Sequence, residues 1–253
     1  MTNRTPGLIA IDIDGCLFPA PTITLDSALL LRLCRLVGGL PVLLCSGRAQ
    51  PYVEAVARIL DLSLPCICEW GGILYTPRPY TIEIHSSVTP VLLDGIANLT
   101  RPFLARGCTV QPKFTALTVY ADTRWPVEDL GRLVNERAAA LGLSPELHIN
   151  IAPDHVDARP RCVDKGKALS VVAQRMQVAL ADVLVIGDDL ADVPMFDVAG
   201  WRAAPANAHP QILVAANLRT TAVCMAAVCD ILDRVLAEGL AGSASTAREG
   251  PNA

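Results

Sequence analysis

The chain lacks the features of a membrane, secreted or nucleic-acid-binding protein. No apolar run is long enough to cross a bilayer, and the opening MTNRTPG leads into an apolar strand without a secretory pattern. The net charge of −4 comes with no basic stripe, whereas a protein that neutralises phosphates of DNA or RNA needs a basic face. We therefore expect a cytoplasmic protein with no membrane and no nucleic acid among its partners.

The chain also lacks the residue spacings of zinc sites and of redox pairs. Its nine cysteines include no CxxC pair, and its four histidines show no zinc spacing. Cys66 and Cys68 are separated by one residue and share a face of an expected strand. We interpret the cysteines as reduced, buried small side chains, and we expect no transition-metal chemistry.

What the chain has is enough apolar material for a large core. Of its 253 residues 52% are hydrophobic and 18% are charged, which is typical of a compact globular protein with one large or two modest domains. There is no internal repeat. Oligomeric state is left open between a monomer and a homodimer.

Strands and helices alternate at both ends of the chain, which is typical of an α/β fold with a mostly parallel, doubly wound sheet. Short connections join the segments of each half, so we expect one sheet built from two separated stretches of sequence. Expected strands are 8–13, 41–45, 65–68, 183–186 and 201–204, and expected helices are 25–37, 51–60, 165–177, 191–198, 210–216 and 225–237.

The middle of the chain predicts a smaller α+β unit inserted into that core. Proline and arginine clusters, TPRPY and ARPRC, mark its two ends. We expect a core of residues 1–77 and 162–242, a cap of residues 78–161 with an antiparallel sheet and two helices, and a flexible tail of 243–253. Expected cap strands are 81–85, 109–111, 115–121, 146–151 and 155–158, and expected helices are 88–105 and 127–141.

Two aspartates end the first expected strand. In IAIDIDGCLF, Asp12 and Asp14 interrupt an apolar run and point to the same side, because side chains alternate along a strand. Gly15 then frees the backbone to turn. Two carboxylates therefore meet at one strand end.

Three further stretches deliver polar groups to the same edge of the sheet, where open α/β folds bind ligands. LLCSGR offers the Ser46 hydroxyl and the Gly47 amide for an oxyanion, and VDKGKAL places Lys165 at a helix start. VLVIGDDLADVPMF brings Asp188, Asp189 and Asp192.

Several ionised aspartates beside an anionic substrate need a cation. Two unit charges about 4 Å apart repel by about 4 kcal/mol at an effective dielectric constant of 20. An incomplete set of carboxylates, with room for water and phosphate, suits Mg²⁺. The sequence therefore predicts Mg²⁺ as cofactor and a small-molecule phosphate ester as partner.

The motifs DIDG, SGR, DKGKAL and GDDLADVPMF, in this order, resemble those of the haloacid dehalogenase superfamily of phosphatases. The insert between the second and third motifs is similar to the caps of the sugar-phosphatase branch, which includes the Cof-like, phosphoglycolate, mannosyl-3-phosphoglycerate, sucrose and trehalose phosphatases. The resemblance implies hydrolysis of a small phosphomonoester, a sugar or sugar-acid phosphate, through an aspartyl-phosphate.

The resemblance also implies a role for each motif residue. Asp12 is the expected nucleophile and Asp14 the expected general acid and base, while Ser46, Gly47 and Lys165 hold the phosphoryl group. The expected Mg²⁺ ligands are Asp12, the backbone carbonyl of Asp14 and Asp188, with Asp192 supporting the water shell or Lys165. Two positions depart from the usual pattern: Cys16 replaces a threonine and Ala191 replaces an asparagine, a loss for which Asp189 would compensate.

Several alternatives stay open at this point. Each motif alone has an ordinary explanation, such as a capped turn for DIDG or a solvated charge for Arg48, and only the joint pattern favours catalysis. A phosphosugar mutase of the same superfamily or a non-catalytic metabolite-binding protein would share the fold. Cues for the substrate disagree, and the cap cations that could read a leaving group are Arg78, Lys113, Arg124, Arg159 and Arg161.

Overall fold

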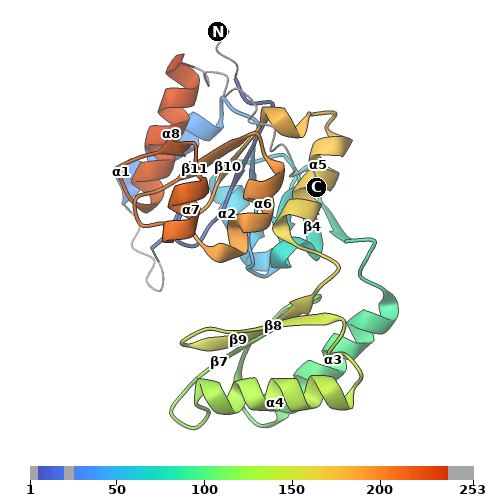
Figure 1. The fold of residues 1–253 in the computed structure, drawn as a ribbon. Helices are drawn as coiled ribbons and strands as arrows, with labels where there is room; N and C mark the ends of the chain where they lie inside the picture. Colours follow the sequence, from blue (N-terminus) through green and yellow to red (C-terminus); the bar gives the residue numbers. More distant parts are fainter. Residues whose placement is uncertain (1–4, 20–25, 239–253) are drawn as a thin grey trace, which may run out of the picture.

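A computed structural model describes residues 5–19 and 26–238 and confirms the expected α/β class (Figure 1). Its main sheet has five parallel strands in the order β12-β11-β10-β1-β2. Strands from both ends of the sequence lie side by side in this sheet, as the alternation predicted. The strands are β1 (Leu8–Ile11), β2 (Val42–Leu44), β10 (Val183–Ile186), β11 (Trp201–Ala204) and β12 (Leu218–Arg219).

Helices cover both faces of the main sheet, so its central strands are apolar on both sides. In β1, Ile9 and Ile11 pack toward one group of helices, while Leu8 and Ala10 pack toward the other. The first group is α1 (Ser27–Val37), α2 (Gln50–Ile59) and α8 (Cys224–Glu238). The second is α5 (Lys165–Arg175), α6 (Val193–Val198) and α7 (Pro210–Ala215).

A short antiparallel sheet continues from the edge of the main sheet. Strand β3 (Cys66–Cys68) forms a parallel bridge to Cys45, next to β2, and then pairs with β4 (Ile73–Thr76). Strand β5 (Thr81–Ile84) pairs with β4. The expectation that 81–85 would join the sheet of the insert is therefore wrong, because TPRPY turns the chain back into a hairpin with β4.

The middle of the chain forms the expected antiparallel sheet with two helices. Its strand order is β6-β7-β9-β8, and in Figure 1 the helices lie on the side of this sheet away from the core. We call Pro90–Pro160 the insert. Its elements are α3 (Pro90–Ala105), β6 (Thr109–Gln111), β7 (Leu117–Tyr120), α4 (Val127–Ala140), β8 (Leu147–Ile151) and β9 (His155–Pro160).

Most differences from the expected elements are at boundaries. Strand β1 ends at Ile11 rather than at residue 13, since Gly15 at φ +77° begins a tight turn that closes on Phe18. The expected helix 191–198 is divided into η3 (Leu190–Asp192) and α6. Strand β12, with only two residues, was not predicted. The expected tail 243–253 lies outside the described residues. The remaining short helices are η1 (Glu69–Gly71) and η2 (Leu180–Asp182).

All nine cysteines are free, as the missing CxxC spacing led us to expect. Within residues 5–19 and 26–238, no helix combines the length and the apolar character that a membrane span requires.

The buried carboxylate of Glu69 ties the core to the insert. Glu69 is fully buried, and its carboxylate accepts hydrogen bonds from the Phe114 amide at 3.1 Å and from the Thr115 amide and hydroxyl at 2.7 Å. Hydrogen bonds to a charged group contribute more than neutral ones. This one side chain therefore positions the loop before β7 against the core.

We expect Glu69→Ala to lower the free energy of unfolding by about 3 kcal/mol, because buried donors would lose their acceptor. Urea denaturation followed by circular dichroism measures the change. Glu136→Ala, which removes an exposed acid from α4 of the insert, is the control and should change stability by less than about 0.5 kcal/mol. Equal losses in the two variants would contradict this role for Glu69.

Candidate active site

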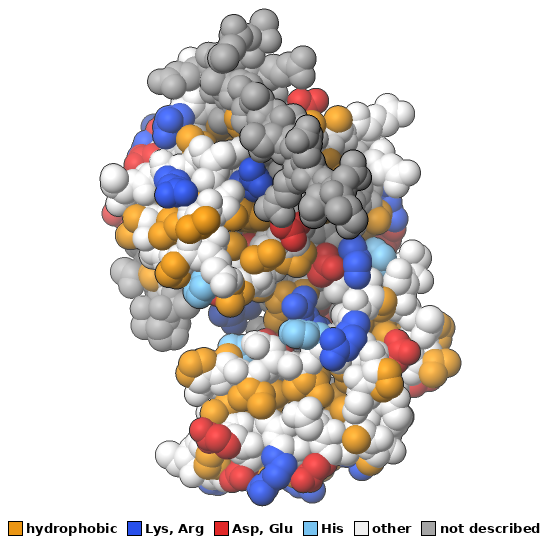
Figure 2. Space-filling model, in the orientation of Figure 1, with side chains coloured by type: hydrophobic (Ala, Val, Ile, Leu, Met, Phe, Trp, Pro, Cys, Tyr) orange, Lys and Arg blue, Asp and Glu red, His pale blue; other side chains and the backbone are white. Residues whose placement is uncertain are grey.

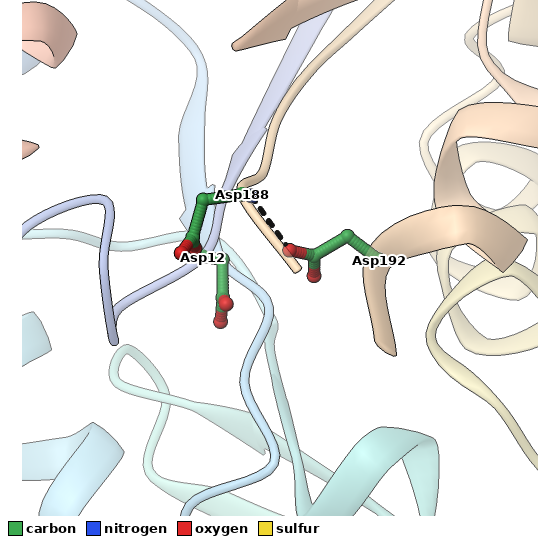
Figure 3. Close-up of side chains that lie close together, drawn as sticks. All are labelled: Asp12, Asp188 and Asp192. Atoms are coloured by element: carbon green, nitrogen blue, oxygen red, sulfur yellow. Dashed lines mark hydrogen bonds between the residues drawn. The ribbon is translucent and has the colours of Figure 1, made fainter. Parts of the chain in front are cut away.

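Charged side chains gather where β1 and β10 end and α5 begins. Asp12 follows β1, Asp188 follows β10, and Asp192 ends η3 (Figure 3). Lys165 is the first residue of α5. These elements pack together because β1 pairs with β10 in parallel, which brings their carboxyl ends to one edge of the sheet.

Lys165 lies between two carboxylates inside the protein. Its Nζ is 2.9 Å from Asp12 Oδ1 and 2.6 Å from Asp192 Oδ1. Lys165 is 2% exposed and Asp192 is fully buried. Charges removed from water to this extent persist only when they are paired, so each of these groups depends on the others.

Burial and the attraction between Lys165 and the carboxylates act in opposite directions on the pKa values of Asp12 and Lys165. Burial, followed by repulsion from Asp192, raises the pKa of Asp12 well above its usual range, although Lys165 counteracts part of the rise. For Lys165, burial alone would lower the pKa, but attraction to Asp12 and Asp192 outweighs it and raises the pKa. The Lys165 ammonium group therefore stays charged. Its one positive charge is shared between two carboxylates, those of Asp12 and Asp192.

Asp192 also orders the loop that carries Asp188. Its Oδ2 accepts hydrogen bonds from the Asp188 amide at 2.9 Å and the Asp189 amide at 3.1 Å, the first of which is drawn in Figure 3. Asp192 thus uses one oxygen for Lys165 and the other for the backbone. Asp189 is exposed.

Asp188 lies against the turn at Gly15. A Cβ on Gly15 would be 1.9 Å from Asp188 Oδ2, so only glycine fits there, at a φ that also favours it. Burial, with repulsion from Asp192 second, raises the pKa of Asp188 to about 7. The Cys16 thiol donates to Asp188 Oδ1 at 3.5 Å, so this departure from the usual threonine keeps a donor at the site.

The acidic residues form a set that a divalent cation fits. Asp12, Asp188 and Asp192 each offer an oxygen, and these three oxygens lie within 4.8 Å of one another. Hard cations such as Mg²⁺ prefer carboxylate oxygens, and burial together with repulsion from Asp192 raises the pKa of both Asp12 and Asp188, a cost of ionisation that a bound cation would offset. The donor chemistry therefore suits Mg²⁺ and not a thiophilic metal.

Asp14 is not part of this acidic cluster and pairs with Arg48. The guanidinium donates from Nε to Asp14 Oδ2 and from Nη2 to Asp14 Oδ1, both at 2.7 Å. Such a two-point ion pair fixes the plane of the carboxylate. From the sequence alone Arg48 has no role in the site, and a solvated charge is the alternative for SGR taken alone; the position of SGR at a strand end is the signal that Arg48 lies near the site.

The Ser46 loop supplies polar groups beside Asp14. Ser46 is fully buried, and its Oγ accepts a hydrogen bond from the Arg48 amide at 3.1 Å. The Gly47 amide has no acceptor among the residues that the structure describes. A Cβ on Gly47 would be 2.5 Å from the Trp70 indole, which shows that this ring lies directly against the loop.

Two residues after β11 hold the loops that carry Gly15 and Asp188, and the sequence motifs did not include either of them. Asn207 donates from its amide to the Gly15 carbonyl at 2.9 Å. The His209 amide donates to the Asp188 carbonyl at 2.7 Å. Both lie in PANAHPQI, which directly follows the strand β11, and that position at the end of a parallel strand was the signal that could have found them.

The five cations proposed for the cap fall into two groups. Arg78 pairs with Asp61, Arg124 donates to the Gly107 carbonyl at 3.0 Å, and Arg161 is exposed. Lys113 and Arg159 instead lie over the ring of Trp70, which contacts Gly47. The structure therefore brings two of the five close to the Ser46 loop.

Comparison with known proteins agrees with these features. Residues 136–232 match the family of haloacid dehalogenase-like hydrolases. A phosphoglycolate phosphatase from Methanopyrus kandleri is 29% identical over 213 residues, covering 81% of this chain and 86% of that protein. A haloacid dehalogenase-like hydrolase structure from Bacteroides thetaiotaomicron has a TM-score of 0.68 at 18% identity, covering 90% of this chain and 98% of that one.

The sucrose-phosphatase from Synechocystis sp. PCC6803, solved with sucrose and phosphate, has a TM-score of 0.59 at 16% identity and covers 91% of this chain and 98% of its own. The likeness to these structures extends over the insert as well as the core, given the share of the chain that they cover. The chain is therefore similar in sequence to haloacid dehalogenase-like hydrolases over residues 136–232, and similar in fold to the two solved structures over most of its length.

We expect Lys165→Met to lower the free energy of unfolding by about 3–5 kcal/mol in metal-free buffer, because Asp12 and Asp192 would stay buried without their partner. Lys167→Met is the matched control: its side chain is 53% exposed, 3.3 Å from Asp164 on the same helix. That change should cost under about 1 kcal/mol. Chemical denaturation in EDTA compares them, and similar losses would refute the idea that the buried trio stabilises the fold.

Proposed function

We propose that the protein is a Mg²⁺-dependent phosphatase that hydrolyses a small phosphomonoester, a sugar or sugar-acid phosphate, through an aspartyl-phosphate. The observation that carries the proposal is the Asp12 carboxylate, held 2.9 Å from the Lys165 ammonium inside an acidic cluster that a divalent cation fits. We also propose that residues 78–161 act as a cap on a core of residues 1–77 and 162–242.

In the proposed first step an oxygen of Asp12 forms a bond to phosphorus while the bond from phosphorus to the ester oxygen breaks. The departing oxygen takes a proton from Asp14 and leaves as an alcohol. In the second step Asp14 removes a proton from water, and the resulting oxygen attacks phosphorus and releases Asp12 and inorganic phosphate. In this structure both Asp14 oxygens accept from Arg48 at 2.7 Å, so Asp14 would leave this ion pair and take up a proton from solvent before it acts as the acid.

Charge stabilisation is the other task of the site. The phosphoryl oxygens would be held by Lys165, by the Ser46 hydroxyl and by the Gly47 amide, a mixture of a cation and neutral donors. Bound Mg²⁺ would neutralise charge that develops on phosphoryl oxygens. Asp12, Asp188 and the backbone carbonyl of Asp14 are the proposed ligands, and Asp192 positions Lys165 and the Asp188 loop.

The nature of the substrate rests on the relatives. Several curated relatives are named phosphoglycolate phosphatase, which acts on the phosphate ester of a two-carbon hydroxy acid. The solved sucrose-phosphatase shares the fold. The names phosphoglycolate phosphatase and sucrose-phosphatase both support a small hydrophilic phosphate ester as the substrate. Because glycolate is a hydroxy acid, the first name also supports a sugar-acid phosphate.

The test is phosphate release from a panel of phosphate esters, with Mg²⁺ and then with EDTA. Asp12→Asn should lower kcat by roughly three orders of magnitude or more, because it removes the proposed nucleophile. The control, Glu136→Gln, alters an exposed acid of α4 and should stay within about threefold of the wild type.

Three outcomes would overturn the assignment. Full turnover by Asp12→Asn would exclude this nucleophile, isomerisation of a phosphosugar without net phosphate release would identify a mutase, and saturable binding without turnover would identify a binding protein. Undiminished activity in EDTA would exclude the proposed Mg²⁺ dependence.

Metal binding should also change how stability depends on pH. The pKa of Asp188, usually 3.8, is raised to about 7 in the folded chain by burial and by Asp192, so the folded state holds a proton that the unfolded state has lost. Metal-free stability should therefore fall as the pH rises from about 4 to about 7. Mg²⁺ should remove most of this fall, because it stabilises the ionised carboxylates.

We expect Asp188→Asn to melt above the wild type in EDTA at about pH 7.5 and to show a smaller rise in Tm on addition of Mg²⁺. Differential scanning calorimetry at about pH 5 and about pH 7.5 measures both quantities. The control Glu136→Gln, which alters an exposed acid of α4, should behave as the wild type. A wild-type Tm that does not respond to Mg²⁺ would contradict metal binding at this cluster.

A further inference from the structure

The sheet of the insert turns a polar face toward the core. Because side chains alternate along a strand, Thr118 and Tyr120 of β7 share one face with His155, Asp157 and Arg159 of β9. The register pairs Thr118 with Asp157 and Tyr120 with His155. The other face is apolar and packs on α3 and α4, with Leu117, Val119, Val156 and Ala158 all buried.

This polar face reaches the catalytic edge. Arg48 Nη1, on the core, lies 3.5 Å from the hydroxyl of Tyr120. In the space-filling view, basic and histidine side chains face the hollow between the core and the insert (Figure 2). Side chains on this face of the sheet are therefore placed to contact the alcohol part of a phosphate ester, which is the leaving group.

Two cations on this side share one aromatic partner. Lys113 Nζ lies 4.0 Å from the centre of a Trp70 ring, and Arg159 Cζ lies 5.7 Å from it. Among the residues that the structure describes, no carboxylate lies within ion-pair distance of either cation. Lys165 and Arg48, by contrast, are each matched with an acid.

The nearest acid, Asp157, attracts Lys113 through its charge but does not contact it, and its oxygens are directed to other partners. Asp157 accepts from the Thr118 hydroxyl at 2.5 Å and contacts His155 Nε2 at 3.1 Å. Lys113 Nζ donates a hydrogen bond to the hydroxyl of Thr118, also at 2.5 Å. The result is a pair of cations beside an aromatic ring with no anion assigned to them, which is the arrangement of an anion-binding site.

The position of the Trp70 ring sets the distance from this pair to the phosphoryl group. One edge of the indole lies against Gly47 of the proposed phosphate loop, and the cations lie over the ring. A molecule that places its phosphate at Gly47 therefore needs to extend past only one aromatic side chain to reach them. This geometry suits a leaving group of a few carbon atoms.

We propose that Lys113 and Arg159, arranged around Trp70, bind an anionic group on the leaving alcohol, either a carboxylate or a second phosphate. The inference rests on the proposed phosphatase function and gives it a substrate class. The acidic cluster of the core would take the phosphoryl group with Mg²⁺, and the cap would read the opposite, anionic end of the substrate.

The protonation of Lys113 offers a signature that a purely structural lysine would not give. Burial lowers the pKa of Lys113 to about 8, so its charge should be lost between about pH 7 and about pH 9. Carboxylates and phosphomonoesters do not titrate in this range. The charged groups around Lys113 are Asp157, Glu69, Arg48 and Asp14, with Arg159 across Trp70 and His155 behind Asp157.

The experiment compares matched pairs of esters with Mg²⁺ present. Phosphoglycolate is compared with its uncharged amide, phosphoglycolamide, and ethylene glycol bisphosphate with the monophosphate of the same diol. For each pair the ratio of kcat/KM is measured, since a ratio does not depend on how much of a variant is folded. The wild type should prefer the anionic member of one pair by about tenfold or more, and which pair it is identifies carboxylate or second phosphate.

Lys113→Met and Arg159→Met should each reduce this preference by about fivefold or more, and Lys113→Arg should restore most of it. The control is Arg132→Met, on the exposed side of α4, which should keep the wild-type ratio. Preference in the wild type should also decline from about pH 7 to about pH 9 and should not decline in Lys113→Arg, whose charge persists.

Two results would overturn the inference and leave the phosphatase proposal intact. One is an unchanged ratio of kcat/KM in both methionine variants, and the other is a wild type that hydrolyses esters with and without the second anionic group equally well. A decline with pH that persists in Lys113→Arg would assign the titration to His155 and not to Lys113. Absence of phosphate release from every ester would be a failure of the proposed function itself.

Discussion

The arrangement of the site depends on one buried ammonium group between two carboxylates. Lys165 can remain charged at 2% exposure only because Asp12 and Asp192 lie within 2.9 Å and 2.6 Å of its Nζ. These three residues come from the ends of separate elements, so the pairing also fixes how the strand ends meet. With Asp188 the cluster has more acid than base, and this imbalance favours a divalent cation among the carboxylates.

The cap side has the opposite imbalance. Lys113 and Arg159 lie over an aromatic ring without an acid of their own, while Asp157 is occupied by Thr118 and His155. A substrate with a phosphate at one end and another anion at the other would balance the charge at both places, its phosphate with Mg²⁺ at the acidic cluster and its second anion at Lys113 and Arg159. The two imbalances thus describe the two ends of one small molecule, which neither the core nor the cap would indicate alone.

The sequence predicted those parts of the structure that depend on short stretches of chain. Strands β1 and β10 are buried apolar runs followed by acids, and a parallel sheet brings their ends together, so Asp12 and Asp188 could be placed before any coordinates. The polar face of the insert could not be predicted, because it requires knowing that β7 pairs with β9 in a register that aligns Thr118 with Asp157. The hairpin of β4 and β5 was missed for the same reason.

One turn connects the two sides of the proposed site. Glu69 and Trp70 both have a left-handed backbone, at φ 50° and φ 55°, a conformation that costs a non-glycine residue energy and persists where surrounding contacts impose it. The Trp70 amide donates to the Ser46 carbonyl at 3.1 Å, and the Glu69 carboxylate holds Phe114, next to Lys113. The turn that contacts the Ser46 loop therefore also sets where Lys113 lies. Because this connection runs through the backbone of the turn and the Glu69 side chain, substitutions at Lys113 can alter which leaving group is accepted without moving Asp12 or its partners.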